Sequence, residues 1–418
     1  MPKADFAAEG AKLLCIIFRY TKAKLPKYGE LYSICPTWYN TTMRVNENIL
    51  ISSLTTMRLG GPARYVLEIE RPEEIPDAYD FAATYNMPTF VLGYGANTIG
   101  HDEGFSGAII INRMRGIIEL PPENNTWTGD ANGGTPNVHK REPSTVGETL
   151  AAGPVQRIKV MGGEYWDNVV EYACKKGLTG IEALSKIPGL TGAAPVQNIG
   201  AYGQEIADTL ESIEVYDTTS HTFKTLSHDD LGFSYRKSIL NTTEKNRYFV
   251  ISITLHLTSG QMEPPFYRSI EKYASDHNIK DFSPQGIRAI VSAIRADKLP
   301  DPLEKASSGS FFKNIYLTEP EAEIAEAKGY PVHHGKDGYK INSGWFIEKA
   351  GFSDKLLHGF RVNPKAALVL INESAKSYND LAAAREEIVN KVYDTYGYWL
   401  EQEPVEIINP PVKIPGVN

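Results

Sequence analysis

A serine hydroxyl set among glycine, two aromatic residues and a cation is the first chemically suggestive feature of this 418-residue chain. It occurs in the stretch Ser308-Gly309-Ser310-Phe311-Phe312-Lys313-Asn314. A small-residue turn followed by aromatics is typical of a strand that enters a core, which is the structural interpretation. A hydroxyl held in place by such neighbours can also serve as a nucleophile or an acid. Ser310 is therefore the leading candidate for a chemical role.

Four further segments precede this serine in the chain, and each contains glycines or a cation where a turn is expected. Gly93 and Gly95 follow a predicted strand, where backbone N–H groups can approach a phosphate without obstruction by side chains. The spacing is not the Rossmann G-x-G-x-x-G, so on its own it is weak evidence, and tight turns are the alternative. The segments are Arg58-Leu59-Gly60-Gly61-Pro62-Ala63, Val91-Leu92-Gly93-Tyr94-Gly95-Ala96-Asn97, the run from Ile187 to Gly203, and Tyr235-Arg236-Lys237-Ser238.

In this order and spacing, the five motifs resemble the UDP-N-acetylenolpyruvoylglucosamine reductase (MurB) family, in its first-type, long form. The resemblance runs from about Glu47 to about Ile407 and includes one insertion. It implies an α+β protein with an FAD-binding fold of the MurB and vanillyl-alcohol-oxidase type in two subdomains, joined to an α+β substrate-binding domain. The implied divisions are an N-terminal extension 1–46, an FAD-binding domain 47–235 with a loop insertion 121–154, a substrate domain 236–348, its C-terminal part 349–407 carrying the catalytic glutamate, and a tail 408–418.

The activity that the resemblance implies is the reduction of UDP-N-acetylglucosamine enolpyruvate to UDP-N-acetylmuramate for peptidoglycan, with NADPH as co-substrate and non-covalent FAD. NADH is not excluded by the sequence. By motif match, Ser310 would donate the proton, Arg236 would lie near the developing enolate, and Glu403 would be the carboxylic partner. A serine is a weak acid, so it can serve only where the acceptor is a strongly basic carbanion.

The glutamate assignment is open. The family reads Leu-Glu-Pro-Glu-Val, whereas this chain reads Leu400-Glu401-Gln402-Glu403-Pro404-Val405-Glu406, with the proline after the second glutamate. Glu401 therefore competes with Glu403, and either could be a solvated strand residue. For Arg236 the alternative is an ordinary surface salt bridge.

The resemblance also assigns contacts to cofactor and substrate. Tyr267 would lie on a loop that closes over the nucleotide, and Lys298 would neutralise a diphosphate, although both could be plain surface residues. Asn314 matches a polar substrate contact. No metal is implied. The cofactor residues are Gly60, Gly61, Gly93, Tyr94, Gly95, Ala96, Asn97, Gly189, Gly192, Ala193, Gln197, Asn198 and Gly200.

Bulk properties exclude several classes of protein. A formal net charge of -8 argues against a general binder of nucleic acid. Three scattered cysteines do not make a disulfide framework or a zinc site. The apolar run Leu13–Phe18 is too short to span a bilayer and shows no cleavage site, so we expect a cytosolic protein without membrane contact. We also expect a monomer.

Hydrophobic periodicity and capping residues predict the elements that must position these groups. Cys174 is expected to be core packing on its helix. Ser283-Pro284 predicts a helix start, with Ile287, Ile290, Val291 and Ile294 as its buried stripe. The other predicted elements are strands 63–70, 89–93 and 157–161 and helices 72–86, 164–176 and 378–396, the last preceding the strand that presents Glu403.

Two rival functions remain at this stage. An oxidase on the same fold would attach flavin through His or Cys, and the turn from Leu92 to His101 contains only His101, interpreted as a solvated loop histidine. A flavin-binding module without turnover is the second rival. The presence of Arg236, Ser310 and Lys298 together argues against it, because a binding module needs no proton donor beside a cation.

Overall fold

The structure is a computed structural model and describes residues 43–121, 154–335 and 338–410. Most of the predicted extension 1–46, the insertion 121–154 and the tail 408–418 lies outside these residues, as do Cys15, Cys35 and the run Leu13–Phe18. In the described part of the chain, no helix is long and apolar enough to cross a membrane.

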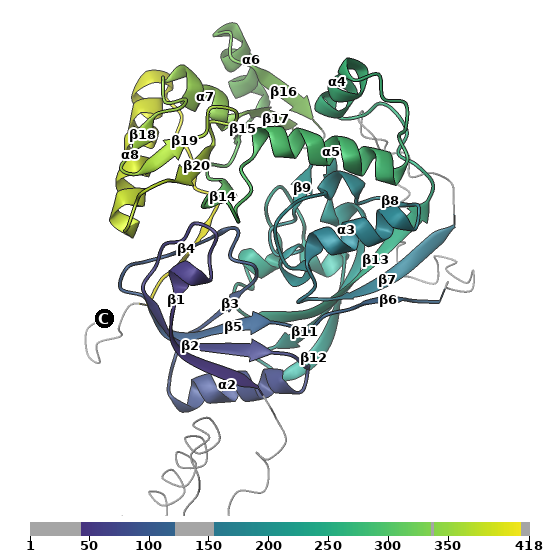
Figure 1. Cartoon of the computed structure of the whole chain (residues 1–418), viewed down its shortest axis with the longest axis vertical. Coiled ribbons are helices and arrows are strands. Elements are labelled where there is room, and N and C mark those ends of the chain that lie inside the picture. Colours follow the sequence, from purple (N-terminus) through teal and green to yellow (C-terminus); the bar gives the residue numbers. More distant parts are fainter. Residues whose placement is uncertain (1–42, 122–153, 336–337, 411–418) are drawn as a thin grey trace, which may run out of the picture.

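The first sheet is built from the N-terminal part of the described chain. Its strand order is β1-β2-β5-β3, with β1 antiparallel to β2 and the other pairs parallel. Helix α2 (Glu74–Thr84) crosses over between β2 and β3 and lies against this sheet, at the bottom of Figure 1. The predicted strands 63–70 and 89–93 and helix 72–86 are confirmed, the first strand one residue earlier and the other two elements slightly shorter. The strands are β1 (Arg44–Leu50), β2 (Pro62–Ile69), β3 (Thr89–Leu92) and β5 (Phe105–Asn112).

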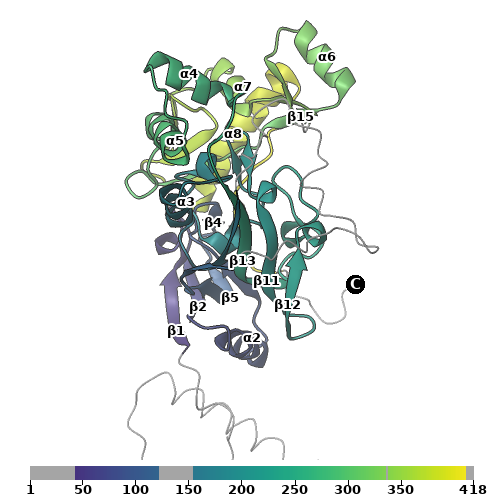
Figure 2. The same ribbon diagram turned by 90° about the vertical axis from the view of Figure 1, so that its right-hand side faces the viewer.

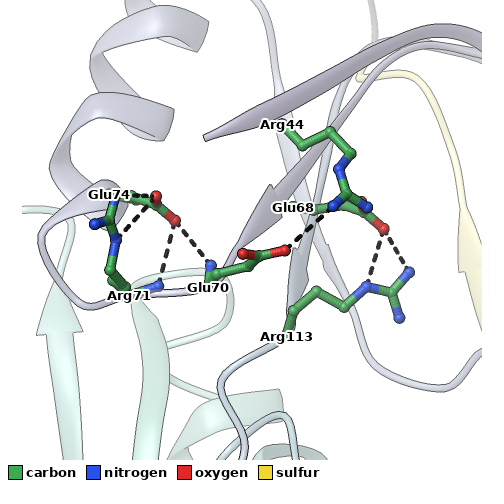
Figure 3. A network of polar contacts seen from close by, with 6 residues as sticks. All are labelled: Arg44, Glu68, Glu70, Arg71, Glu74 and Arg113. Atoms are coloured by element: carbon green, nitrogen blue, oxygen red, sulfur yellow. Dashed lines mark hydrogen bonds and ion pairs between the residues drawn. The ribbon is translucent and has the colours of Figure 1, made fainter. Parts of the chain in front are cut away.

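A polar network attaches strand β1 to this sheet (Figure 3). Glu68 accepts two hydrogen bonds from the Arg113 guanidinium, at 2.9 and 2.7 Å, and one from Arg44 at 2.9 Å. Glu68 is buried, so the two cations compensate a carboxylate that would otherwise be costly to place there. Residues 44–46 therefore belong to the sheet, and the predicted boundary after residue 46 falls inside β1.

The second sheet is antiparallel throughout and has the order β12-β11-β13-β7-β6, with β8 paired to β13. Helix α3 (Trp166–Lys175) buries Trp166, Val169, Val170, Ala173 and Cys174 against it, as its sequence predicts. Strand β13 carries this sheet to Ser259, beyond the predicted domain boundary at Tyr235. The strands are β6 (Ile117–Glu119), β7 (Val155–Met161), β8 (Leu178–Thr179), β11 (Leu210–Asp217), β12 (Thr222–Ser227) and β13 (Tyr248–Ser259).

Two helices connect the second sheet to the region predicted as the substrate domain, which we call the substrate-side part. Helix α4 (Arg268–Asp276) precedes α5 (Pro284–Lys298), whose N-terminus is capped by Ser283 Oγ, which accepts from Gly286 N at 3.2 Å. The predicted helix start and buried stripe are confirmed. Arg288 on α5 binds Asp167 on α3 through two hydrogen bonds of 2.6 and 2.9 Å. Helix α5 is thereby fixed to the second sheet's covering helix.

The last third of the described chain builds a core around α8 (Tyr378–Tyr396), whose bounds match the predicted helix 378–396. Met57, Leu59 and Ile99 from the first part of the chain join this core. A four-stranded sheet has the order β14-β20-β19-β18, and a three-stranded sheet has the order β15-β17-β16. Two further helices are α6 (Glu319–Ala327) and α7 (Ser343–Lys349). The strands are β14 (Ser307–Ser310), β15 (Ile315–Leu317), β16 (Val332–Gly335), β17 (Gly338–Ile341), β18 (Leu356–Leu357), β19 (Phe360–Val362) and β20 (Val369–Asn372).

The chain finally returns to its beginning. Strand β21 (Val405–Ile407) pairs in parallel with β4 (Thr98–Gly100), so the C-terminal segment runs from α8 back to the first part of the molecule (Figure 1). Figure 2 shows α2 at one end of the long axis and α4, α6 and α7 at the other. A two-stranded hairpin of β9 (Gly200–Ala201) and β10 (Gln204–Glu205) completes the strands.

Candidate active site

Ser310 ends strand β14, at an irregularity in its pairing with β20. Ser307 pairs with Ile371 and Ser310 with Val369, and the register shifts between them. Gly309 supplies the bend with φ +69°, a left-handed value that favours glycine. Phe311 and Phe312 follow and are fully buried, with their rings edge to face at 5.0 Å. The aromatic pair therefore anchors a bent strand end on which Ser310 is half-buried.

Arg236 and Glu403 meet although they come from distant parts of the chain. Arg236 Nε donates to Glu403 Oε1 at 3.2 Å, and Arg236 Nη2 donates to the carbonyl of Gly200 at 3.0 Å. The guanidinium also lies over the ring of Tyr235, 5.0 Å from its centroid. Only 19% of the Arg236 side chain and 11% of the Glu403 side chain are exposed, so this is not an ordinary surface salt bridge.

Burial dominates the electrostatics of this pair. It raises the pKa of Glu403, while the charges of Arg236 and Lys313 oppose that shift. Arg236 also has φ +55°, a left-handed conformation that is uncommon for a residue with a side chain. Such backbone strain is often found where a side chain must point in a functional direction.

The register of the C-terminal segment separates the two candidate glutamates. Glu403 N donates to the carbonyl of Phe311 at 2.8 Å, and Lys313 N donates to the carbonyl of Glu401 at 2.8 Å. This antiparallel pairing places Glu403 one residue from Ser310 and beside Arg236. The Glu401 side chain is 73% exposed and pairs with Lys313 Nζ. Glu403 therefore lies at the site, and Glu401 lies on its outer edge.

The predicted phosphate loop and the long glycine-containing run lie against each other. Asn97 Nδ2 donates to Gln197 Oε1 at 2.7 Å, and a Cβ on Gly93 would lie 3.3 Å from the Cβ of Ala193. Tyr94, in the same loop, packs edge to face on Tyr165 at 5.8 Å. Ala96 shares the turn between β3 and β4. The structure thus brings these two predicted cofactor segments together.

Other predicted cofactor residues are engaged within the protein. A Cβ on Gly60 or Gly61 would meet backbone or side-chain atoms at 2.8 and 2.2 Å, so the approach of neighbouring chain segments explains both glycines. The amide nitrogen of buried Asn198 donates to Glu205 and to the Ser234 carbonyl, and its oxygen accepts from Ala207 N. Gly192 and Gly200 likewise face protein atoms, with a Cβ on Gly200 3.3 Å from Arg236 Nη1.

Two observations fit a bound cofactor beside these loops. A Cβ on Gly189 would have no atom within 4 Å, so the backbone there borders open space. The Oγ of Ser308 is buried and has no hydrogen-bond partner among the described residues, and a buried hydroxyl normally has one. Thr56 Oγ1 contacts the carbonyls of both Ser307 (2.6 Å) and Gly95 (3.3 Å), which places β14 next to the 93–97 loop.

The predicted substrate residues are more scattered. Asn314 hydrogen-bonds with Tyr235, and its Oδ1 accepts from Ser343 N at 3.4 Å. Tyr267 is 40% exposed and packs edge to face on Tyr202 at 5.9 Å. Lys298 is exposed in the last turn of α5, and no ion pair of its side chain occurs within residues 43–121, 154–335 and 338–410.

Sequence reasoning missed three residues near this site and was wrong about a fourth. Ser308 was passed over because its burial cannot be read from one motif. Arg295 and Tyr202 hydrogen-bond with each other, and burial lowers the pKa of Arg295. His101 was interpreted as a solvated loop residue, but its side chain is only 15% exposed and stacks on Tyr378 at 3.6 Å. The side chain of His101 is covered by helix α8, which lies more than 270 residues further along the chain, so its burial has no local signal in the sequence.

Comparisons with known proteins agree with this architecture. The FAD binding domain family matches residues 153–225, and the family described as UDP-N-acetylenolpyruvoylglucosamine reductase, C-terminal domain, matches residues 301–407. A solved structure of UDP-N-acetylenolpyruvylglucosamine reductase (MurB) from Thermus caldophilus covers 88% of this chain and 100% of its own, with a TM-score of 0.56 and 23% identity. The predicted α+β fold class is confirmed.

The curated relatives extend this likeness to sequence. The UDP-N-acetylenolpyruvoylglucosamine reductase of Ralstonia nicotianae is 31% identical over 355 residues, which are 84% of this chain and 96% of that protein. The protein of the same name from Aliivibrio fischeri is 30% identical and covers 86% of this chain and 94% of its own length. The fold and the two matched domain families together identify this protein as an FAD-dependent oxidoreductase. More particularly, the chain belongs to the UDP-N-acetylenolpyruvoylglucosamine reductase family, as its motifs indicate.

Proposed function

We propose that this protein reduces UDP-N-acetylglucosamine enolpyruvate to UDP-N-acetylmuramate, a peptidoglycan precursor, with NADPH as reductant. Its relatives from Ralstonia nicotianae and Aliivibrio fischeri carry the name of this reductase. The single observation that supports the proposal most strongly is the buried contact of Arg236 with Glu403, whose backbone pairs with the residue after Ser310. Reduction of an enolpyruvyl ether requires a hydride, which the cofactor would supply, and in addition a cation and a proton donor, which these residues would supply.

The loops 93–97 and 189–198 would hold the cofactor. When bound, FAD supplies a hydride carrier between NADPH and the terminal methylene carbon of the enolpyruvyl group. Gly93 and Gly189 would let backbone N–H groups approach its diphosphate, and Asn97 and Gln197 fix the two loops relative to each other. Ser308 Oγ, which has no partner among the described residues, is available to hydrogen-bond a bound group.

Arg236 and Glu403 would stabilise the negative charge that develops on the substrate carboxylate. A buried guanidinium acts strongly because little water screens it. Since burial raises the pKa of Glu403, its carboxyl gives up a proton less readily than an ordinary glutamate, and in the protonated form it can donate a hydrogen bond to a carboxylate oxygen. The pair is held in place before substrate arrives, which is the arrangement that lowers a barrier.

Ser310 would give its proton to the carbon beside the carboxylate. The bend at Gly309 presents the hydroxyl, and the buried Phe311 and Phe312 keep the strand end rigid. A rigid donor matters here because a serine is a weak acid and depends on geometry. Tyr267 and Lys298 would contact the nucleotide part of the substrate, and Asn314 would make a polar contact with the substrate. A cytosolic location, a monomeric state and NADPH as the reductant, with NADH as the alternative, stay predictions.

Anaerobic stopped-flow absorbance tests this proposal. The purified protein is mixed with NADPH while the visible band of oxidised flavin is followed, and UDP-N-acetylglucosamine enolpyruvate is then added. We expect bleaching, followed by recovery that depends on the enolpyruvyl substrate. Recovery only on admission of oxygen would favour an oxidase, and the absence of flavin or of bleaching would favour a binding module without turnover.

A further inference from the structure

The carboxylate of Glu406 is the centre of a polar cluster that the proposed reaction does not use. Its Oε2 lies 2.8 Å from His101 Nε2. Its Oε1 accepts from Tyr378 Oη at 3.0 Å, from Arg385 Nη1 at 3.0 Å and from Gln402 Nε2 at 3.1 Å. We call these five residues the Glu406 cluster.

The cluster joins three parts of the chain. His101 follows β4 in the cofactor-binding part, Tyr378 and Arg385 lie on α8, and Glu406 lies in β21. The rings of His101 and Tyr378 stack at 3.6 Å with an interplanar angle of 20°. Four polar contacts therefore meet at the carboxylate of Glu406, whose side chain is 22% exposed, and two of the contacting residues also stack on each other.

Glu403 depends on the same segment. Residues 401–403 pair with residues 311–313, directly after Ser310, through a bridge between Phe312 and Gln402, whereas Val405–Ile407 pair with β4. Val405 N also donates to the carbonyl of Asn97 in the phosphate loop, at 2.9 Å. The segment that carries Glu403 thus lies between residues 311–313 and the 93–97 loop. Its register is set by backbone pairing on both sides.

Pro404 makes that register difficult to hold. It lies between the two pairings and offers no backbone N–H, so one donor is missing where the chain passes from one neighbour to the other. The side chain of Gln402 supplies hydrogen bonds in place of the one that Pro404 cannot donate. Its Nε2 donates to the Pro404 carbonyl at 2.9 Å and to Glu406, and its Oε1 accepts from Arg385 Nη1 at 2.7 Å.

We infer that Glu406 is a positioning residue for Glu403: through Gln402, Arg385 and His101 it fixes the register of residues 401–407 and so the contact of Glu403 with Arg236. Misplacement of a catalytic group by about 1 Å can cost about 100-fold in rate. The inference rests on the proposed function, because Glu403 matters only if the enolpyruvyl half-reaction occurs.

The test compares the two half-reactions separately by anaerobic stopped-flow. In Glu406→Ala, we expect flavin reduction by NADPH to stay within about twofold of wild type and reoxidation by UDP-N-acetylglucosamine enolpyruvate to slow by at least about tenfold. Glu406→Gln keeps hydrogen-bonding capacity toward His101 and Arg385 and should restore most of the lost rate. His101→Phe keeps a ring stacked on Tyr378 but removes the bond to Glu406, so it should give a smaller, equally selective loss.

Two controls make the outcome interpretable. Glu373→Ala removes an exposed carboxylate that binds Arg361 at 2.7 and 3.0 Å on the same substrate-side part, and it should change neither half-reaction. The visible spectrum and FAD content of each variant report separately on cofactor retention.

Equal slowing of both half-reactions in Glu406→Ala and His101→Phe, or loss of FAD from both, would overturn the inference, because it would assign the cluster a purely structural role. Unchanged kinetics in both variants would overturn it as well. If Glu406→Ala does not fold, His101→Phe and Glu406→Gln decide the question. If the wild-type protein is reduced by NADPH but not reoxidised by the enolpyruvyl substrate, the proposed function itself is contradicted. This result differs from failure of the inference, which appears only in the variants.

Discussion

Arg236 Nε lies 3.2 Å from Glu403 Oε1, although 167 positions separate the two residues in the chain. Replacing Arg236 by Met would remove the cation from the place where the enolate charge is proposed to develop. Loss of one such donor typically costs about 100- to 1000-fold in rate. We expect Arg236→Met to slow reoxidation by the enolpyruvyl substrate by this factor, and Arg236→Lys by less, in anaerobic stopped-flow. Arg361→Met, which breaks the ion pair of Arg361 with Glu373 instead, serves as the control.

The contact between Arg236 and Glu403 also shows where sequence reasoning reaches its limit. The motif names both residues, but the altered Leu400–Glu406 segment cannot distinguish Glu401 from Glu403. The pairing of residues 401–403 with 311–313 makes that distinction, and such a pairing depends on chain segments about 90 residues apart. Local patterns carry no information about it.

Elements with local signals were predicted closely. Helix α8 spans Tyr378–Tyr396 as expected, because Ser377 caps its start and Gly397 ends it with φ +80°. By contrast, β13 could not be assigned to the second sheet from sequence, since its partners β11 and β7 lie far away in the chain. His101 was misinterpreted for the same reason: its burial comes from α8 and β21. The fold of single elements was thus readable, and their assembly was not.

The raised pKa of Glu403 gives a pH dependence with a defined sign. If the protonated carboxyl is the form that assists, the rate of reoxidation falls as pH rises through the pKa of Glu403, which burial places above its ordinary value. In Glu403→Gln this alkaline limb should disappear, with a lower but pH-independent rate. A reoxidation profile that keeps the same limb in Glu403→Gln would assign the titration to another group. Glu401→Gln, on the exposed neighbour, should keep the wild-type profile.

Ser310→Ala should separate the two half-reactions. Without the hydroxyl, flavin reduction by NADPH is expected to stay nearly intact, whereas reoxidation by the enolpyruvyl substrate should slow by several orders of magnitude, since the group proposed to supply the proton is gone. Ser310→Cys offers a stronger acid of similar size and should retain part of the rate. An unchanged second half-reaction in Ser310→Ala would remove Ser310 from the mechanism.

Asp217 predicts how stability changes in acid. Its side chain is fully buried and accepts hydrogen bonds from Arg247 at 3.0 and 2.9 Å and from Lys224 at 2.6 Å. The bonds from Arg247, and then those from Lys224, hold its pKa well below the ordinary value of 3.8. The folded state therefore binds this proton less readily than the unfolded state, and the stabilisation is present above about pH 4 and is lost as pH falls below it.

Asp217→Asn should lower Tm at pH 7 and flatten the fall of Tm between about pH 5 and pH 3, measured by scanning calorimetry. Asp276→Asn is the control, because Asp276 is an exposed carboxylate that pairs with its helix neighbour Lys272. A wild-type slope that persists in Asp217→Asn would assign the acid sensitivity to other carboxylates.

Cys174 should be chemically inert in the folded protein. It lies on the buried face of α3 and packs among Val170, Leu178 and other core residues, and burial raises the pKa of its thiol to about 12. The thiolate is the reactive form, and at pH 8 a thiol with that pKa is ionised to about one part in 10,000. Iodoacetamide followed by peptide mass spectrometry should leave Cys174 unmodified in the native protein and modify it in urea. Cys174→Ala should lower Tm through the lost packing without changing either half-reaction, whereas a selective kinetic defect would place this thiol in the chemistry.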